Sequence, residues 1–274
     1  MIAGLLQGQQ ADGGFGVHPY SKWKGGHWRL VSLVELGVPR TSLEANRAAD
    51  HVLDWIAAPA EPLVIAGRER RHASMEGNAL AVCSRLGKHR DRRVRHLVEV
   101  LLRSQWPDGG WNCDRNPKAT HSSFHESLAP IWGLVEYHRE TGHQGAWDAA
   151  TAAGEMLLRH ELFKSSRTGA PIHPEWMQIH WPHYWHYDFF QGLRAVAMLG
   201  LARDPRAAAA LERLQKLRRA DGTWRAGGRR YWTRGTEAVD WGDASQVITA
   251  AAERILPMSR YVASRGAHLT SSER

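Results

Sequence analysis

The chain has 274 residues, 43% of them hydrophobic, which is ordinary for a globular protein and enough to bury a sizeable core. Two cysteines are too few for a disulfide framework, which excludes the class of disulfide-rich proteins. No apolar run approaches the roughly 18 residues of a membrane span, which excludes a protein with transmembrane helices. The net charge of +8 comes mainly from arginines that match no nucleic-acid-binding motif and indicate solvated helix faces, with an anionic substrate or partner as the alternative.

Two kinds of predicted helix alternate along the chain. One kind is charged and has apolar residues three and four apart, as in an amphipathic outer helix. It covers Met1–Gln9, Glu44–Ala57, Arg92–Ser104, Ala146–His160 and Pro205–Arg219. The other kind is less charged and more continuously apolar, as in a buried helix. It covers Gly26–Leu36, Met75–Leu86, Ser122–Tyr137, Tyr184–Leu199 and Glu237–Ile255.

The alternation predicts one fold class. Strand patterns are absent, and several buried helices end at a glycine, the expected stop signal. We therefore predict an all-α protein, a single α/α toroid over residues 1–262 with about five to six helical hairpins, the buried helices inside and the amphipathic ones outside. The polar segment 263–274 is predicted to be a frayed tail. No signal peptide is recognisable, and with so few cysteines we expect a cytoplasmic protein.

A short motif recurs at three turns of the chain. It reads QQADGGF at Gln9–Phe15, QWPDGGW at Gln105–Trp111 and RRADGTW at Arg218–Trp224, where the Gln and the second Gly are replaced. This motif resembles the prenyltransferase and squalene-cyclase repeat of the terpenoid-cyclase and protein-prenyltransferase toroids. The resemblance implies a toroid with a central cavity, in which the motif ties one helix end to its neighbour, and a terpenoid-like substrate.

The resemblance also bears on metal binding. Protein prenyltransferases hold zinc with Asp, Cys and His, and Cys113, Asp114 and several histidines occupy comparable regions here. From the residues themselves, Cys113 stays open as a soft ligand, a nucleophile activated by a nearby His, or a packed thiol. A zinc site formed by Cys113, Asp114 and His121 is therefore one expectation, and a site without a cofactor is the other.

Polar and aromatic side chains collect where the buried helices begin. Because parallel inner helices bring those ends to one mouth of a ring, we expect a common cavity rather than helix caps alone. The candidate catalytic residues are His121, His125, His183, Asp188, Asp114 and Glu126. The candidate substrate-binding residues are Lys22, His27, Trp28, His72, Glu76, Trp181, Tyr184, His186, Tyr187 and Trp241.

Spacing adds a geometric expectation for two of these histidines. His121 and His125 are four residues apart and are predicted to share a helix face, which suits a metal pair or an acid–base pair. The same spacing relates Tyr184 to Asp188.

These expectations describe an enzyme, a cyclase- or prenyltransferase-like lyase, isomerase or transferase. It acts on a small, partly apolar molecule, terpenoid or anionic, by acid–base chemistry with or without a metal. The alternative is a non-catalytic toroid that binds a lipid-like ligand or a protein partner. We expect no nucleic-acid partner, and a homodimer or a partner that completes the ring stays open.

Overall fold

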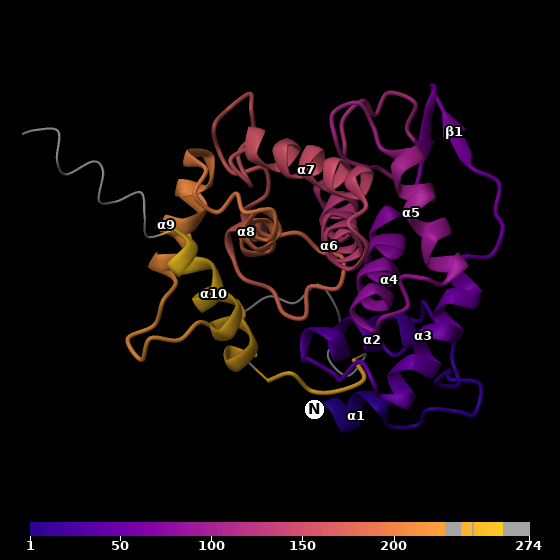
Figure 1. Ribbon diagram of the computed structural model, residues 1–274. Coiled ribbons are helices and arrows are strands. Elements are labelled where there is room, and N and C mark those ends of the chain that lie inside the picture. Colours follow the sequence, from indigo (N-terminus) through magenta and orange to yellow (C-terminus); the bar gives the residue numbers. More distant parts are fainter. Residues whose placement is uncertain (228–236, 243, 260–274) are drawn as a thin grey trace, which may run out of the picture. The chain divides into compact units, whose positions relative to one another are not determined.

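The computed structural model describes residues 1–227, 237–242 and 244–259. In these parts the chain forms ten α-helices, two short 3-10 helices and one two-stranded sheet (Figure 1). The mainly helical class predicted from the sequence is therefore confirmed. None of the described helices is both long and apolar enough to cross a bilayer. The predicted tail at 263–274 lies outside the described residues.

Contacts between Cα atoms divide the chain into two compact units. The described part of unit 1 comprises Met1–Met156, Pro182–Tyr187 and residues 237–242. The described part of unit 2 comprises Leu157–Trp181, residues 188–227 and residues 244–259. The chain therefore leaves unit 1 and returns to it with short segments.

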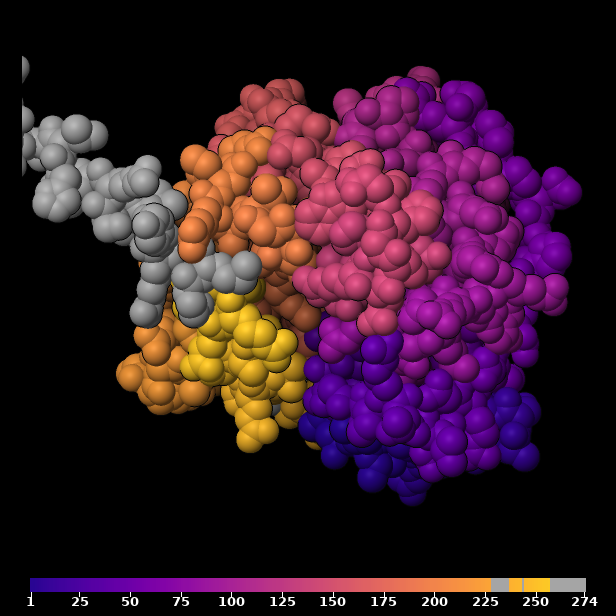
Figure 2. Space-filling view, in the orientation of Figure 1, coloured from indigo at the N-terminus to yellow at the C-terminus, as the bar shows by residue number. Residues whose placement is uncertain are grey.

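Unit 1 alternates buried and amphipathic helices. The short first helix is α1 (Ile2–Leu6), and the buried helices are α2 (Gly26–Glu35), α4 (Ala73–Arg85) and α6 (Phe124–Thr141). The amphipathic helices are α3 (Leu43–Ile56), α5 (Arg92–Ser104) and α7 (Gln144–Arg159), the last of which ends in unit 2. α3 and α5 lie on the outer side of α2 and α4 (Figure 1), and in the space-filling view the indigo to magenta residues form a continuous surface (Figure 2).

The closest helix pair in unit 1 is α4 with α6, and glycines explain the approach. A Cβ atom added at Gly77 would lie 2.3 Å from the backbone nitrogen of Pro130, and one at Gly133 would lie 2.5 Å from the carbonyl oxygen of Gly77. Only hydrogen fits at either position. The close approach brings the beginnings of α4 and α6 together.

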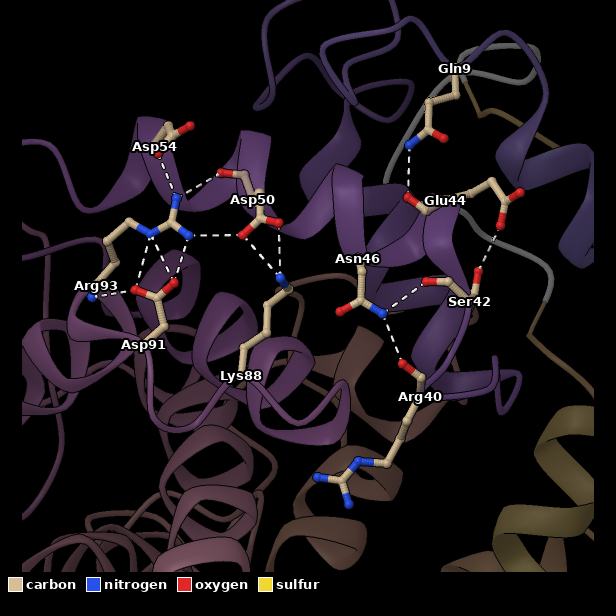
Figure 3. Close-up of polar contacts among 10 residues, drawn as sticks. All are labelled: Gln9, Arg40, Ser42, Glu44, Asn46, Asp50, Asp54, Lys88, Asp91 and Arg93. Atoms are coloured by element: carbon tan, nitrogen blue, oxygen red, sulfur yellow. Dashed lines mark hydrogen bonds and ion pairs between the residues drawn. The ribbon is translucent and has the colours of Figure 1, made fainter.

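The recurring turn motif makes the same contacts in its first two copies. Nε2 of Gln9 donates to the carbonyl oxygens of Gly13 at 3.2 Å and Glu44 at 2.8 Å, the second contact visible in Figure 3. Nε2 of Gln105 donates to those of Gly109 at 2.7 Å and Ala149 at 2.8 Å. Each glutamine thus ties its own turn to the next amphipathic helix, which is the structural role that the sequence predicts.

Ion pairs join the amphipathic helices α3 and α5 (Figure 3). The Arg93 guanidinium donates to Asp50 at 2.8 Å, to Asp54 at 2.6 Å and to Asp91 at 2.6 Å. Lys88 adds a bond of 2.9 Å to Asp50. These charges are partly exposed, so they act mainly to fix the packing direction of α3 against α5.

Unit 2 contains the remaining helices. They are η1 (Pro174–Met177), α8 (Phe189–Met198), η2 (Pro205–Ala207), α9 (Ala208–Lys216) and α10 (Ser245–Ser259). α8 contacts both α9 and α10. In the third motif copy the indole of Trp224 donates to the Leu214 carbonyl at 2.7 Å, as Trp111 donates to Leu101 at 2.9 Å in unit 1.

The structure corrects the sequence interpretation in one connection. The expected absence of strands was wrong, because β1 (Leu63–Ile65) and β2 (Arg68–Arg70) form an antiparallel hairpin. Its two-residue turn has φ of 51° at Ala66 and 72° at Gly67, the backbone conformation that matches the twist of paired strands.

The beginnings of three buried helices were also predicted too early. α6 begins at Phe124 rather than at Ser122, α8 at Phe189 rather than at Tyr184, and α10 at Ser245 rather than at Glu237. Asp188 caps α8 by accepting a bond from the Gln191 amide at 2.9 Å. The shared helix faces predicted for His121 with His125, and for Tyr184 with Asp188, therefore do not exist.

Candidate functional site

Three side chains with metal-binding atoms meet where α4 and α6 begin. His72 immediately precedes α4, Glu126 lies in the first turn of α6, and Cys113 lies in the connection between α5 and α6. One potential ligand atom from each lies within 4.8 Å of the others. Nδ1 of His72 is 3.6 Å from Oε1 of Glu126. Among the described residues, this is the one group of three such side chains close enough to hold a metal ion.

Backbone pairing places Cys113 beside His72. The amide of Arg71 donates to the Asn112 carbonyl at 2.9 Å, which brings the next residue of each segment, His72 and Cys113, close together. The buried guanidinium of Arg70 donates to the carbonyls of Asn116 and Ala119, each at 3.4 Å. Arg70 of the β-hairpin and Arg71 directly after it therefore hold this connection both before and after Cys113.

A backbone bond orients the carboxylate of Glu126. Oε2 accepts from the Ser74 amide at 2.9 Å, at the beginning of α4, while Oε1 faces His72. Burial acts to raise the pKa of Glu126, but hydrogen bonds from His72 and Ser74 outweigh it and hold the pKa below its ordinary value. Hydrogen bonding to Cys113, and then to Glu126, raises the pKa of His72 to about 10.

The negative charge of Glu126 contributes to the raised pKa values of two neighbouring groups, Glu76 and Tyr20. Burial raises the pKa of Glu76 to about 6, although Arg71 donates to Oε1 of Glu76 at 2.8 Å and acts in the opposite direction. Burial also raises the pKa of Tyr20, and negative charge on Glu126 and Cys113 adds to that effect. Tyr20 therefore lies close enough to the cluster to respond to its charge.

The arrangement of the three side chains distinguishes a metal site from a nucleophile relay. In a Cys–His–carboxylate relay, the sulfur and the carboxylate bond to opposite nitrogens of the imidazole, so the ring separates them. Here one ligand atom of each of the three side chains lies within 4.8 Å of the other two, so the imidazole ring does not separate the Cys113 sulfur from the Glu126 carboxylate. The donor atoms thus surround one point, as metal ligands do.

Aromatic side chains form a second cluster in unit 1, at the segment Pro182–Tyr187. Tyr184 stacks on Trp23 with ring centroids 4.3 Å apart and an interplanar angle of 2°. The Tyr184 carbonyl accepts from Nδ2 of Asn78 at 3.1 Å, and the Tyr187 amide donates to Nδ1 of His125 at 2.9 Å. Three residues of the same unit therefore hold the segment: Trp23 just before α2, Asn78 on α4 and His125 on α6.

The other unit 1 candidates near this cluster are mostly buried. His27, Trp28, Glu76, Tyr184, His186 and Tyr187 are buried, and so are His183 and Trp241. Lys22 and His72 are exposed, and His125 is half-buried. The imidazole of His186 stacks on Trp185 at 3.9 Å. The structure thus brings His125, Tyr184, His186 and Tyr187 together, as expected for one site.

Two proposed zinc ligands lie elsewhere. His121 and Asp114 are exposed, and neither belongs to the group of His72, Cys113 and Glu126. Oδ1 of Asp114 accepts from the Asn116 amide at 2.9 Å, a local turn bond that keeps it at the surface. The zinc set predicted from the sequence therefore needs correction, with Cys113 retained and the other two ligands replaced.

Asp188 and Trp181 belong to unit 2. Besides capping α8, Asp188 accepts from the backbone amide of His180 at 2.8 Å and lies 3.2 Å from Nδ1 of the same histidine. Trp181 lies under the guanidinium of Arg194 at 5.6 Å. These contacts give Asp188 a structural role at the beginning of α8.

Sequence reasoning placed Cys113 and Glu126 near the start of the same helix but did not join His72 to them. It also missed Tyr20, Trp23 and Trp185, although the density of aromatic residues around Lys22 was a usable signal.

Comparisons of the chain with protein-family models, with curated proteins and with solved structures found no match in any of the three.

Proposed function

We propose that the chain is an enzyme of the terpenoid-cyclase and prenyltransferase toroid superfamily, with one ring over residues 1–262. The proposal is supported by the turn motif, whose glutamines make matching contacts, and by three successive pairs of buried and amphipathic helices in unit 1. The substrate we propose is a small, partly apolar molecule. The aromatic side chains of Pro182–Tyr187 lie in the same unit as His72, Cys113 and Glu126 and offer it an apolar surface.

The observation that carries the proposal is the convergence of His72, Cys113 and Glu126. An imidazole, a thiolate and a carboxylate are donors that suit zinc, and three protein ligands with a free fourth position are typical of catalytic zinc. Oε1 of Glu126 is directed to the proposed site while Oε2 is fixed by the Ser74 amide, the orientation that a supporting contact gives to a metal ligand. We propose zinc at this site.

Each residue has a role in this proposal. Bound zinc would supply Lewis acidity toward a substrate oxygen or water. Glu76 has a carboxyl pKa of about 6, raised by burial, so it can hold or release a proton near neutral pH. Ser74 orients Glu126, and the buried rings of Trp23 and Tyr184 exclude water.

Zinc titration of chelator-treated protein tests the proposal. We expect close to one zinc per chain by elemental analysis, and cobalt substitution should give a thiolate charge-transfer band. Cys113→Ser, His72→Asn and Glu126→Gln should each weaken zinc binding by roughly tenfold or more.

The chain offers matched controls for these variants. Asp114→Asn and His121→Asn change the residues of the earlier set and should bind zinc as the wild type does. Cys83→Ser removes the other thiol, whose pKa burial raises to about 12, and should also have no effect. Zinc binding that depends on Asp114 and His121, or no binding at all, would contradict the proposal.

A further inference from the structure

The ammonium of the exposed side chain of Lys22 lies among three aromatic rings of unit 1. Nζ of Lys22 is 6.0 Å from the ring centroid of Tyr20, and 5.5 Å from those of Trp23 and Trp185. We call these three rings the aromatic cage. No carboxylate in the described part of the chain lies within ion-pair distance of Lys22. The faces of the rings, with their negative quadrupole, are therefore what the ammonium contacts.

Two walls of the cage are held by rings that do not contact Lys22. Trp23 is 3% exposed and stacks on Tyr184 at 4.3 Å. Trp185 stacks on His186 at 3.9 Å. Both indoles therefore keep a stacking partner whether or not the lysine is present.

The third wall is fixed in the same way. The ring of Tyr20 meets Trp28 edge-on at 5.5 Å, and the Trp28 indole donates to the Tyr20 carbonyl at 2.8 Å. Contacts within unit 1 therefore position all three walls of the cage.

Lys22 is a poor final occupant for such a cage. A primary ammonium is compact and strongly hydrated, and it gives up that hydration reluctantly. A quaternary ammonium carries the same charge with weaker hydration and a larger apolar surface, which is why aromatic cages select it. The flexible stem of Lys22 lets its ammonium leave the cage without moving the walls.

We propose that the aromatic cage of Tyr20, Trp23 and Trp185 binds an alkylated ammonium ligand, and that Lys22 occupies the site until such a ligand displaces it. The inference names a ligand class beyond the proposed function, and it does not require zinc.

Titration with choline tests this inference, and 3,3-dimethylbutan-1-ol serves as its neutral isostere. Chelator-treated protein is titrated at constant ionic strength, and intrinsic tryptophan fluorescence is recorded. Choline should give a saturable change, and the neutral alcohol should give none at equal concentration. Lys22→Met removes the competing charge but keeps the stem length, so it should bind choline about threefold more tightly or better.

A tryptophan pair provides the matched control. Trp185→Leu removes one wall and should weaken choline binding about tenfold, whereas Trp147→Leu on α7, another half-buried tryptophan, should leave it unchanged. Equal responses to choline and the alcohol, no binding to Lys22→Met, or equal choline affinity in Lys22→Met and wild type would each overturn the inference. Because the protein is metal-free, none of these outcomes depends on whether the zinc proposal holds.

Discussion

His27 lies in the first turn of α2, with its imidazole edge-on to Trp28 at 4.6 Å and near Trp55 at 5.8 Å. It is 1% exposed, and Nε2 has no hydrogen-bond partner. Burial lowers the pKa of His27 to about 3. In the unfolded state the imidazole takes up a proton below about pH 6.5. Between this pH and about 3, the unfolded state therefore binds more protons than the folded state. Stability is therefore complete above pH 6.5 and is lost as the pH falls toward 3.

The variant His27→Phe should remove this acid sensitivity, because the ring volume stays similar and no proton is bound in the unfolded state. Between pH 7 and pH 5 the free energy of unfolding of the wild type should fall by about 2 kcal/mol more than that of the variant. Urea denaturation at both pH values measures the difference. The same substitution at exposed His96 is the control for the loss of a histidine ring outside the core.

At the scale of single elements, periodicity predicted the helices well where both ends carry strong signals. α3 and α5 were placed within a residue or so because charged, apolar and capping positions agree along their length. α8 was predicted too early because Tyr184–Tyr187 is as aromatic as the helix that follows, and the cap at Asp188 was the better signal. The β-hairpin was missed because strands of three residues leave almost no alternation to detect.

The turn motif gives a prediction at this scale. Gln105→Ala removes one bond within the turn, to Gly109, and one that ties the turn to Ala149 of α7, so the free energy of unfolding should fall by about 1–2 kcal/mol. Gln144→Ala removes an exposed bond to Asp148 on the same helix and should change stability by less than about 0.5 kcal/mol. Denaturant unfolding measures both. Equal effects of the two substitutions would show that the motif does not tie the helices.

At the scale of the whole molecule, the composition of the candidate site was predictable but its grouping was not. Cys113 and Glu126 lie near the start of the same helix, but His72 is 41 residues before Cys113, and no spacing rule connects it to them. They meet because Gly77 and Gly133 let α4 and α6 approach and because the hairpin holds the Cys113 connection. Both causes are tertiary, whereas His121 attracted attention through a spacing that matters only inside a helix.

Zinc binding should register in the stability of the folded chain. An ion that binds only the folded state adds about 2.7 kcal/mol to the free energy of unfolding at a hundredfold excess over its dissociation constant. Thermal unfolding of the wild type should therefore shift upward when zinc is added to that excess. For Cys113→Ser at the same zinc concentration, a tenfold loss of affinity reduces the gain to about 1.4 kcal/mol, and a larger loss reduces it further, so its shift should be clearly smaller. An equal shift in both proteins would point to binding elsewhere.

The stacking of Tyr184 on Trp23 has a consequence for biosynthesis. A ribosome adds Tyr184 about 160 residues after Trp23, and at about 5–20 residues per second this interval is on the order of ten seconds. Throughout that interval the nascent chain presents Trp23 without its stacking partner, and the Asn78 amide lacks the Tyr184 carbonyl. The first helices of unit 1 therefore leave the ribosome before their contacts with Tyr184 can form. We expect a chaperone that binds exposed aromatic side chains to act mainly in this interval.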